Sequence, residues 1–343
     1  MNKLLTIIIP TYNMEVYLPK CLSSLIVDDE SLMNMMEVLI VNDGSKDRSS
    51  EIAHDYYTSY PDVFRVIDKE NGNYGSCVNI ALPMVNGEYV KILDADDYFD
   101  NDVLPAFLSF LQNIDADVVL SDFMQITAGG ERKALFEFNV PDDRVVGISE
   151  MTSMDINHAL MHGVTYRTEL VRSINYRQTE GISYTDQEWI SIPIAYAKTV
   201  AHFPRVLYCY LVEREGQTMD PVVFEKTFWM EVKGARVMID ALLARMNELS
   251  HDGRHYMKER IIRRSSIIAY SYFWSQKETK NWELLVDYDN YLKEKLPDVW
   301  SELGEEQKRC GIKYIKYWRE KGYPKRPMIV RLIRLKDKLG LHR

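Results

Sequence analysis

Residues 89–97 read Tyr-Val-Lys-Ile-Leu-Asp-Ala-Asp-Asp, a strand-like run followed directly by carboxylates. Two similar runs precede it, residues 6–13 (Thr-Ile-Ile-Ile-Pro-Thr-Tyr-Asn) and residues 38–45 (Val-Leu-Ile-Val-Asn-Asp-Gly-Ser). Helix-length segments separate the three runs, and this alternation is typical of βαβ units in a parallel sheet. Ligands of such sheets bind outside the carboxyl ends of the strands. The three polar turns are therefore expected at one edge of the sheet, where they can form one site.

The same alternation continues over about the first 220 residues. A turn at residues 128–130 with an apolar run at 135–140 predicts a hairpin or an edge strand added to the parallel sheet. Residues 199–212 predict a pair of short strands. Pro19 lies inside the first helical segment, where it either precedes the helix or kinks it. The expected fold is α/β with a mainly parallel sheet. Its strands are expected at 4–10, 37–42, 63–68, 88–94 and 116–122, and its helices at about 15–26, 47–59, 75–84 and 101–113.

The composition changes near Pro221. Residues 222–300 contain almost no Gly or Pro, and their apolar residues recur at helical spacing, which predicts an all-helical domain. We therefore expect two domains, residues 1–220 and 221–343. The aromatic content of the second domain suits a homo-oligomer interface, and a buried core explains it equally well.

The last part of the helical domain, residues 308–343, is strongly basic. It holds thirteen Lys or Arg and two acidic residues, a net charge of +11, whereas the whole chain carries −9. Pro324 and Pro327 divide it into two short amphipathic helices. Helices of this kind either lie in a membrane interface or pack on a domain and leave their basic face in water. The charge favours an anionic surface as partner.

Composition limits the classes of protein to which the chain can belong. No apolar run reaches the roughly 18 residues of a membrane span, and the N-terminus lacks the features of a signal peptide. The cysteines at positions 21, 77, 209 and 310 form no CxxC pair and are expected to be reduced thiols. We expect a cytoplasmic protein whose tail contacts the inner face of the membrane peripherally. The acidic body opposes nucleic-acid binding, and no recognition motif accompanies the basic tail.

The turn Asp94-Ala95-Asp96 has the chemistry of a nucleotide and metal site. Hard divalent cations prefer oxygen ligands, often one or two carboxylates together with substrate phosphates. One carboxylate can reach the ribose and the other a metal that bridges the diphosphate, although the same turn could simply cap the next helix. Asp43, at the end of the second run, suits a base N–H or a ribose hydroxyl, and Gly44 permits close approach of the backbone. Tyr12 offers an aromatic face for the base.

These turns, with residues 70–75 (Glu-Asn-Gly-Asn-Tyr-Gly) and Asn79, resemble glycosyltransferase family 2, the inverting enzymes of the GT-A fold. The resemblance covers roughly residues 1–220. It implies a nucleotide-sugar donor, here expected to be a UDP-sugar that gives a hexosyl or N-acetylhexosaminyl group, and Mn²⁺ or Mg²⁺ as cofactor. It assigns Asp96 to the metal, and Asp94 with Ala95 to the ribose and diphosphate. The positions that match the base and ribose site are Pro10, Thr11, Tyr12, Glu15, Asp43 and Asn71.

Inverting transfer also needs a base that removes the proton of the acceptor hydroxyl. The resemblance points to Asp186 at the start of a helix, where Thr185 stands in place of an acidic residue of the family's element. Glu188 and Glu180 are the alternative bases, and Asp186 could also be only a helix cap.

Two residues farther along the chain complete the candidate site. Arg214 follows a Tyr-rich segment that resembles the family's closing element, and it could clamp phosphate beside a flexible loop. His202 could approach the metal, although a lone His is more often a structural residue.

The expected function is a metal-dependent inverting glycosyltransferase that adds one sugar per encounter, because the Gln-x-x-Arg-Trp element of processive synthases is absent. The expected acceptor is a glycan, a lipid-linked saccharide or a glycoprotein in the synthesis of a cell-surface polysaccharide or glycoconjugate. Two alternatives stay open. A sugar nucleotidyltransferase would have a glycine-rich basic loop near the N-terminus, and none is visible. A catalytically silent scaffold subunit would have lost the acidic pair or the base, and both are present.

Overall fold

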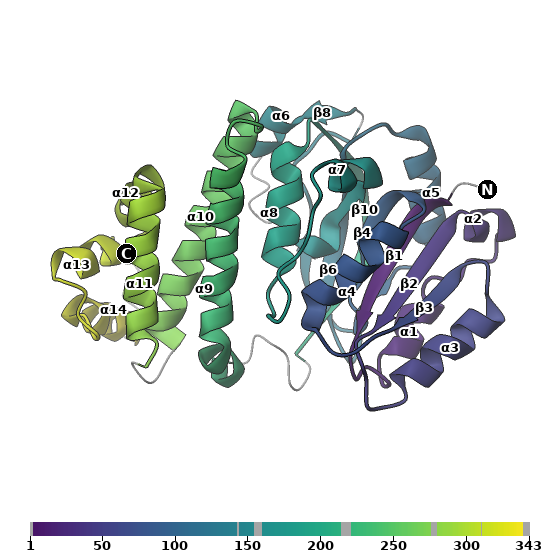
Figure 1. The fold of residues 1–343 in the computed structure, drawn as a ribbon, viewed down its shortest axis with the longest axis horizontal. Helices are drawn as coiled ribbons and strands as arrows, with labels where there is room; N and C mark the ends of the chain where they lie inside the picture. The colour runs from purple at the N-terminus through teal and green to yellow at the C-terminus, as the bar shows by residue number, and fades with distance from the viewer. Residues whose placement is uncertain are drawn as a thin grey trace. The chain divides into compact units, whose positions relative to one another are not determined.

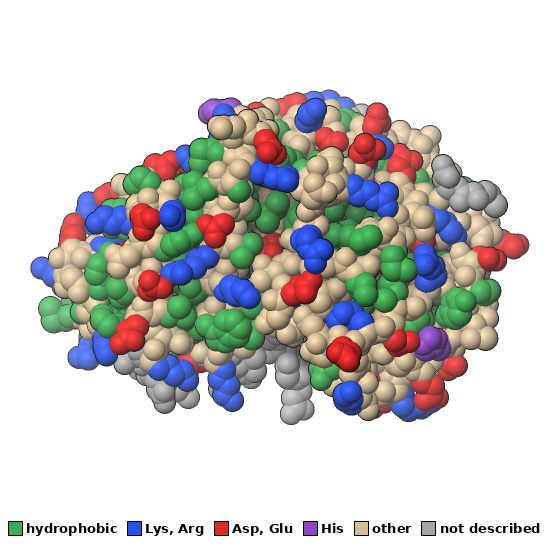
Figure 2. Space-filling view, in the orientation of Figure 1, with side chains coloured by type: hydrophobic (Ala, Val, Ile, Leu, Met, Phe, Trp, Pro, Cys, Tyr) green, Lys and Arg blue, Asp and Glu red, His purple; other side chains and the backbone are tan. Residues whose placement is uncertain are grey.

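The computed structural model describes residues 3–142, 144–153, 160–213, 221–275, 280–309 and 311–338. The chain forms two compact units, Met1–Glu215 and Gly216–Arg343 (Figure 1). The first unit has the predicted α/β fold, and the second is built of helices. Within the described ranges, none of the helices is both long and apolar enough to cross a membrane. Acidic and basic side chains are interspersed on the face shown in Figure 2.

A mixed sheet forms the centre of the first unit. Its described strands are β1 (Lys3–Thr11), β2 (Met36–Asn42), β3 (Phe64–Asp68), β4 (Gly87–Ile92), β5 (Tyr98–Phe99), β6 (Val118–Thr127), β7 (Arg132–Phe136), β8 (Val146–Gly147), β9 (Val164–Arg167) and β10 (Thr199–Val212). Their order is β3-β2-β1-β4-β9-β6-β10-β5, while β7 pairs with β6 and β8 with β10. The strands β3, β2, β1 and β4 are parallel, as are β6 and β10. Between these groups β9 is antiparallel to both neighbours, so antiparallel pairs interrupt the parallel sheet that the sequence predicted.

The carboxyl ends of the parallel strands meet at one edge, as predicted. Thr11 pairs with Asn42, and Asn42 pairs with Asp68. The Leu93 amide donates to the Ile8 carbonyl at 3.0 Å. Almost all residues of β1 and β2 are buried, which explains their continuous apolar sequences. The loops after β1, β2, β3 and β4 therefore leave the sheet side by side.

Two sequence predictions on strands have different outcomes. The predicted hairpin is present, because β6 and β7 pair antiparallel across the turn. Residues 199–212, by contrast, are one strand, β10, and not two. The pairing of β10 with β6 shifts register between Phe203 and Val206. Pro204 lies in that shift, where a residue without an N–H is tolerated because the ladder is already interrupted.

Helices join the strands of the first unit. Pro19 lies in the first turn of the first helix, which begins at Leu18. It therefore starts this helix without kinking it, since no N–H is needed there. The helices are α1 (Leu18–Ser23), α2 (Glu30–Asn34), α3 (Ser49–Ser59), α4 (Asn73–Ala81), α5 (Leu104–Asn113), α6 (Ile148–Ser153), α7 (Thr168–Ser173) and α8 (Asp186–Tyr196), with 3-10 turns η1 (Leu82–Met84) and η3 (Met161–Gly163).

The second unit packs its helices around aromatic residues and buried ion pairs. Arg264 pairs with Glu231 at 2.7 Å, and Arg319 pairs with Asp289 at 2.7 Å. The helices described are α9 (Pro221–Ala244), α10 (His251–Tyr270), α11 (Trp282–Lys295), α12 (Pro297–Glu306), α13 (Tyr314–Glu320) and α14 (Met328–Lys338), with a π-helical turn η4 (Ser271–Ser275). The predicted pair of tail helices is thus present as α13 and α14.

Candidate active site

The acidic turn after β4 is held by its own backbone and by two tyrosines. The Asp97 amide donates to the Asp94 carbonyl at 3.0 Å, and Asp94 Oδ1 accepts a hydrogen bond from Tyr74 Oη at 2.7 Å. The Asp94 amide donates to Tyr208 Oη at 3.1 Å. Asp94 and Asp96 are both half-buried, so the turn presents two carboxylates at the edge of the sheet.

Asp97 is the buried anchor of this turn. It is 1% exposed. Its Oδ2 accepts from Tyr208 Oη at 2.6 Å, and its Oδ1 accepts from the Leu211 amide at 2.7 Å. Burial raises the pKa of the Asp97 carboxyl well above its usual value, and the charges of Asp96 and Asp94 add to the effect. The helix α5 has no side-chain cap, so the turn does not cap it, and Asp97 ties the turn to β10 instead.

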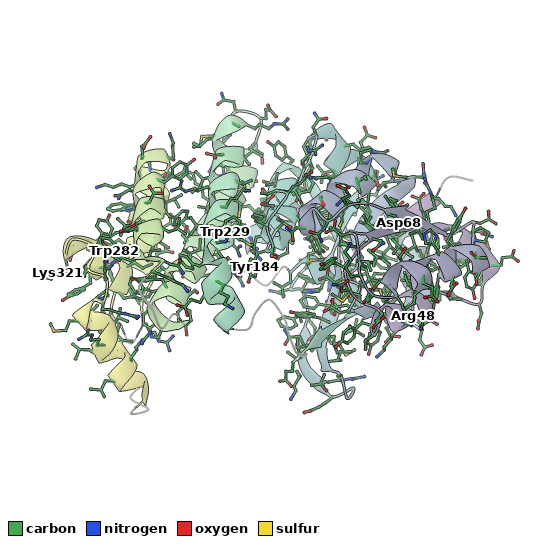
Figure 3. All side chains as sticks on the ribbon, turned by 60° about the horizontal axis from the view of Figure 1, so that its bottom comes forward. Arg48, Asp68, Tyr184, Trp229, Trp282 and Lys321 are labelled. Carbon is green, nitrogen blue, oxygen red and sulfur yellow. The ribbon has the colours of Figure 1, made fainter. Side chains whose placement is uncertain are left out.

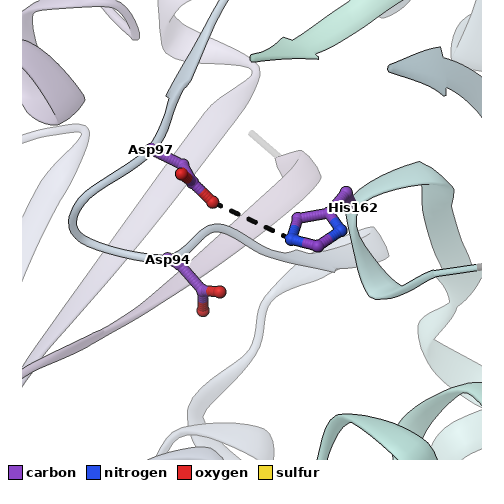
Figure 4. A group of neighbouring side chains, drawn as sticks. All are labelled: Asp94, Asp97 and His162. Atoms are coloured by element: carbon purple, nitrogen blue, oxygen red, sulfur yellow. Dashed lines mark ion pairs between the residues drawn. The ribbon is translucent and has the colours of Figure 1, made fainter. Parts of the chain in front are cut away.

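A histidine that the sequence analysis did not select, His162 of η3, lies against the turn (Figure 4). Its Nε2 is 3.9 Å from Asp97 Oδ2, and ligand atoms of Asp94, Asp97 and His162 lie within 4.8 Å of one another. Burial, with the nearby Lys91, lowers the pKa of His162 to about 3. The ring is therefore neutral at physiological pH, the form that binds metals. Its face stacks on the Tyr210 ring at 4.1 Å between centroids.

Lys91 holds His162 in place. It is fully buried, and its Nζ donates to the carbonyls of His162 at 2.8 Å and Val164 at 3.1 Å. Burial lowers the pKa of Lys91 to about 7. Because β9 is antiparallel to β4, the start of β9, and not its end, reaches the carboxyl edge of β4. This reversal brings η3 to the acidic turn.

The donors at this turn fit a divalent cation. Carboxylate oxygens suit Mg²⁺ and Mn²⁺, and imidazole is a common ligand of transition metals. Asp97 already accepts two hydrogen bonds from buried donors. The ligand atoms that the structure brings together are those of Asp94, Asp97 and His162, and the half-buried Asp96, the predicted metal ligand, lies in the same turn.

The predicted nucleotide side of the site is built around Asp43, which is 3% exposed. Its amide donates to the Thr11 carbonyl at 2.8 Å. Its Oδ1 accepts from Lys69 Nζ at 2.5 Å and from the Gly72 amide at 2.9 Å. Asn71 Nδ2 donates to the Asp43 carbonyl at 3.1 Å. The structure thus brings two predicted base-and-ribose residues, Asp43 and Asn71, into one hydrogen-bonded frame.

The loop after β1 supplies the other residues predicted for the nucleotide. Pro10 and Thr11 are buried at the end of the strand. Tyr12 is 45% exposed, so its ring is accessible to a base. Glu15 Oε2 accepts from the Arg48 amide at 3.0 Å, where α3 begins (Arg48 is labelled in Figure 3). One oxygen of Glu15 therefore fixes the neighbouring loop.

Asp186, the first residue of α8, is the base candidate that the geometry favours. It is half-buried. Glu188 is 1% exposed, and its Oε2 accepts from the Thr179 amide at 2.8 Å. Glu180 Oε1 accepts from Asn79 Nδ2 at 2.8 Å. Glu188 is therefore buried within the loop that leads into α8. Glu180 is exposed and is held by Asn79 and by Arg177, whereas among the described residues the carboxylate of Asp186 bonds only to the neighbouring Gln187.

Two tyrosines have pKa values that are affected both by the acidic turn and by Asp186. Burial raises the pKa of Tyr74 well above its usual value, and the charges of Asp94 and Asp186 contribute. Burial also raises the pKa of Tyr210 to about 12, and the same two carboxylates contribute together with the rest of the turn.

The helix α4 connects the two parts of the site. Near its start, Tyr74 donates to Asp94. Farther along, Asn79 Nδ2 donates to the Gln178 carbonyl at 2.9 Å, and the Gln178 amide donates to Asn79 Oδ1 at 2.8 Å. A Cβ on Gly75 would lie 2.2 Å from the Thr179 carbonyl oxygen. The loop ahead of Asp186 is therefore pressed onto the helix that also holds the acidic turn.

Of the two remaining predicted site residues, the structure describes only His202. His202 Nε2 lies 2.9 Å from Asp122 Oδ1, and its Nδ1 lies 3.0 Å from the Val140 carbonyl. Both ring nitrogens have protein partners, so the geometry favours the structural alternative for His202, and His162 is the histidine at the acidic turn. Arg214 lies outside the residues that the structure describes.

The site residues Thr11 to Asp97 and His162 fall within one recognisable segment. Residues 6–170 match the family model of glycosyl transferase family 2. This segment is that of a glycosyltransferase family 2 protein. The resemblance noted from the motifs is thereby confirmed.

Similar proteins extend the comparison beyond this segment. The chain is similar to the poly(ribitol-phosphate) beta-N-acetylglucosaminyltransferase TarS of Staphylococcus aureus, with 25% identity over 248 residues, 72% of this chain and 42% of that protein. It is 39% identical over 122 residues to an uncharacterized glycosyltransferase of Mycoplasma pneumoniae, over 35% of this chain and 39% of that protein. The chain thus spans about two fifths of the length of these relatives.

A solved structure shares the fold. The crystal structure of S. aureus TarS 1–349 in complex with UDP-GlcNAc has a TM-score of 0.69 and 19% identity, over 98% of this chain and 92% of that chain. At this identity the likeness shows the fold alone. It confirms the predicted GT-A fold with a helical region after it.

Proposed function

We propose that the chain transfers one sugar from a UDP-sugar to an acceptor hydroxyl with inversion at the anomeric carbon. The proposal is supported by the place of the Asp43 frame and the acidic turn at one edge of the sheet, with α4 bonded both to the acidic turn and to the loop ahead of Asp186. The complex of TarS with UDP-GlcNAc supports a UDP-sugar as donor. All groups assigned to the transfer come from residues 1–220, so this part is proposed as the catalytic domain and residues 221–343 as a separate helical domain.

The donor is proposed to lie across the carboxyl edge of the sheet. The exposed ring of Tyr12 stacks on the base, and Asp43 and Asn71 bond to the base or the ribose, as Asp residues at this position of parallel sheets do. Asp94 bonds to the ribose, so the diphosphate lies over the acidic turn. Because four hydrogen bonds already position Asp43, little ordering free energy is lost when the sugar donor binds.

Asp96 and His162 would hold Mn²⁺ or Mg²⁺ at the turn, next to Asp94. When bound, such an ion neutralises the charge that develops on the leaving diphosphate. Metal dependence is thus part of the proposal.

Asp186 is proposed to take the proton of the acceptor hydroxyl. The acceptor oxygen then forms a bond to the anomeric carbon from the face opposite the donor phosphate. The bond between that carbon and the phosphate oxygen breaks, and UDP leaves with the electron pair. A positioned carboxylate of this kind contributes a rate factor of about 10²–10⁴.

The acceptor is proposed to be a hydroxyl of a cell-surface polymer. TarS and a similar protein of Bacillus spizizenii are both named as transferases acting on poly(ribitol-phosphate). The second is 26% identical over 63% of this chain and 33% of its own length, so the acceptor of this chain is inferred only at the level of a polyol or glycan hydroxyl.

The test is release of nucleotide from a panel of nucleotide sugars with Mn²⁺ or Mg²⁺, without and with polyol-phosphate acceptors. We expect one UDP-sugar to be cleaved, EDTA to stop the reaction, and Asp96→Ala to abolish it. Asp186→Asn should lower kcat by about 10²-fold or more while UDP still binds in calorimetry. Glu180→Gln is the matched control and should retain transfer. If Asp186→Asn stays fully active, or no donor is bound or cleaved, the proposal is wrong.

A further inference from the structure

The helix α14 carries apolar side chains on two opposite faces. Val330 and Ile333 are 5% and 0% exposed and pack into the second unit. Met328, Leu332 and Leu335 are 66%, 48% and 55% exposed. At about 100° per residue, positions i, i+4 and i+7 form a stripe on the side opposite the buried pair. We call these three residues the outer stripe.

Basic residues border the outer stripe. Residues 321–338 hold seven Lys or Arg and one acidic residue. Lys321, Lys325 and Arg331 are exposed, and within the described part of the chain none of the three forms an ion pair. Lys321 and Lys325 lie over aromatic rings of the unit (Lys321 is labelled in Figure 3). These cationic groups are therefore at the surface and, among the described residues, have no carboxylate partner. Arg331, on α14 itself, is the one that directly borders the stripe.

The first half of the basic tail, which contains α13, is different because its apolar side chains pack inside the second unit. Ile315 and Trp318 of α13 are each 1% exposed. Lys313 and Lys316 both pair with Glu305. From the sequence, either tail helix could lie in a membrane interface or pack on the domain. The structure shows that the apolar face of α13 is part of the core. Of the two tail helices, α14 is the one with an apolar face exposed to solvent.

We propose that the outer stripe and its basic border dock on an anionic lipid surface. Neighbouring apolar side chains exposed to water are unfavourable. Insertion among lipid headgroups buries them, and the same orientation brings the cationic groups to anionic headgroups. A soluble polyanion would engage the basic residues and leave the stripe in water. A second copy of the chain would bury the stripe but bring like charges together. An anionic lipid surface matches both features.

The test is flotation of the full chain with vesicles of phosphatidylcholine, with and without phosphatidylglycerol. Leu332→Gln with Leu335→Gln removes most of the stripe at exposed positions, so the fold is retained. Ile267→Gln is the matched control, because Ile267 is an apolar residue of α10 that is 39% exposed. Arg331→Gln tests the charge. Melting curves check that each variant is folded. Deletion of residues 308–343 is unsuitable as a test because it removes the core residues of α13.

The expected result is binding to vesicles that contain phosphatidylglycerol and weaker binding as salt is added. The leucine variant should lose about tenfold or more in partition coefficient, Arg331→Gln about fivefold, and Ile267→Gln nothing measurable. The inference is overturned if the wild-type chain ignores anionic vesicles or if the leucine variant binds them equally well. A dimer in sedimentation that the leucine variant disrupts, without vesicle binding, would assign the stripe to a second copy. Binding to inorganic polyphosphate without vesicle binding would assign the basic border to a soluble polyanion. Vesicle binding needs no donor, so the result is independent of the proposed transferase activity.

Discussion

Removal of one hydroxyl tests whether Tyr208 secures the acidic turn. Tyr208→Phe keeps the ring, which is fully buried and lies 4.8 Å from the His162 ring between centroids. It deletes the bond to Asp97 Oδ2 at 2.6 Å and the bond from the Asp94 amide at 3.1 Å. The matched control is Tyr210→Phe, two positions on in β10, because no described residue forms a hydrogen bond with the Tyr210 hydroxyl.

The magnitude follows from the two lost bonds. A hydrogen bond to a buried charged or polarised carboxyl is worth about 1.5–3 kcal/mol and one to a backbone amide about 1 kcal/mol. Asp97 is left buried with one donor fewer. The free energy of unfolding should therefore fall by about 2–4 kcal/mol in Tyr208→Phe and by less than about 1 kcal/mol in Tyr210→Phe.

The measurement is urea unfolding followed by circular dichroism, with the donor KM determined for both variants. Tyr208→Phe frees the Asp94 backbone, so we also expect its donor KM to rise about tenfold while that of the control changes little. Equal loss of stability in the two variants, or no loss in either, would refute the role given to Tyr208.

Three further predictions concern packing and reactivity. Gly75→Ala should lower the free energy of unfolding by about 1–3 kcal/mol, because the new Cβ would lie 2.2 Å from the Thr179 carbonyl oxygen in the loop ahead of Asp186. Gly129→Ala is the control and should leave the melting temperature unchanged, because the nearest atom to its Cβ is 3.7 Å away. Equal melting temperatures for the two variants would contradict the close approach at Gly75. Glu231→Ala leaves a buried arginine without its partner and should cost about 3–5 kcal/mol in urea unfolding, whereas Glu51→Ala, in an exposed pair, should cost less than about 1 kcal/mol. Burial raises the pKa of the Cys77 thiol to about 12, so little thiolate forms at pH 8. Mass spectrometry should find Cys77 alkylated by iodoacetamide in urea and not in buffer, and rapid labelling in buffer would show that the thiol is accessible.

The parallel half of the sheet could be predicted because its strands are short apolar runs with polar turns between them. β1 and β2 are buried on both faces, and burial of that kind imposes a continuous apolar sequence. The same logic places Asp43 and Asp94 at one edge, since parallel strands end together. These parts of the site depend on local sequence and on one topological rule.

His162 could not be found in this way because topology brings it to the turn. It precedes the four-residue strand β9, which is too short for periodicity to identify, and it reaches the edge because β9 runs against its neighbours. A signal was nevertheless present in Lys91, a lysine between apolar neighbours in the buried part of β4. Such a residue needs buried acceptors, and its acceptors include the His162 carbonyl. His202, chosen because it is a histidine, has both nitrogens engaged elsewhere.

The tail shows a second limit of sequence patterns. α13 and α14 are both basic and amphipathic, and an amphipathic pattern does not say whether the apolar face meets protein or solvent. Trp318 is in the core, whereas Leu332 and Leu335 are exposed. That difference depends on which surfaces of the helical unit are already filled, so only the packed structure distinguishes the two helices.

The close contact between α4 and the loop at residues 176–181 limits which segments of this chain can be exchanged with those of its relatives. Gly75 and Asn79 fit this loop through backbone contact and reciprocal hydrogen bonds. A chimera with a junction anywhere between residues 81 and 176 would combine the helix of one parent with the loop of another. Donor preference could then be exchanged correctly and activity still lost, because Asp186 would follow a loop that no longer seats on its helix. Donor-site segments of this protein should therefore be exchanged together with the loop, as one unit.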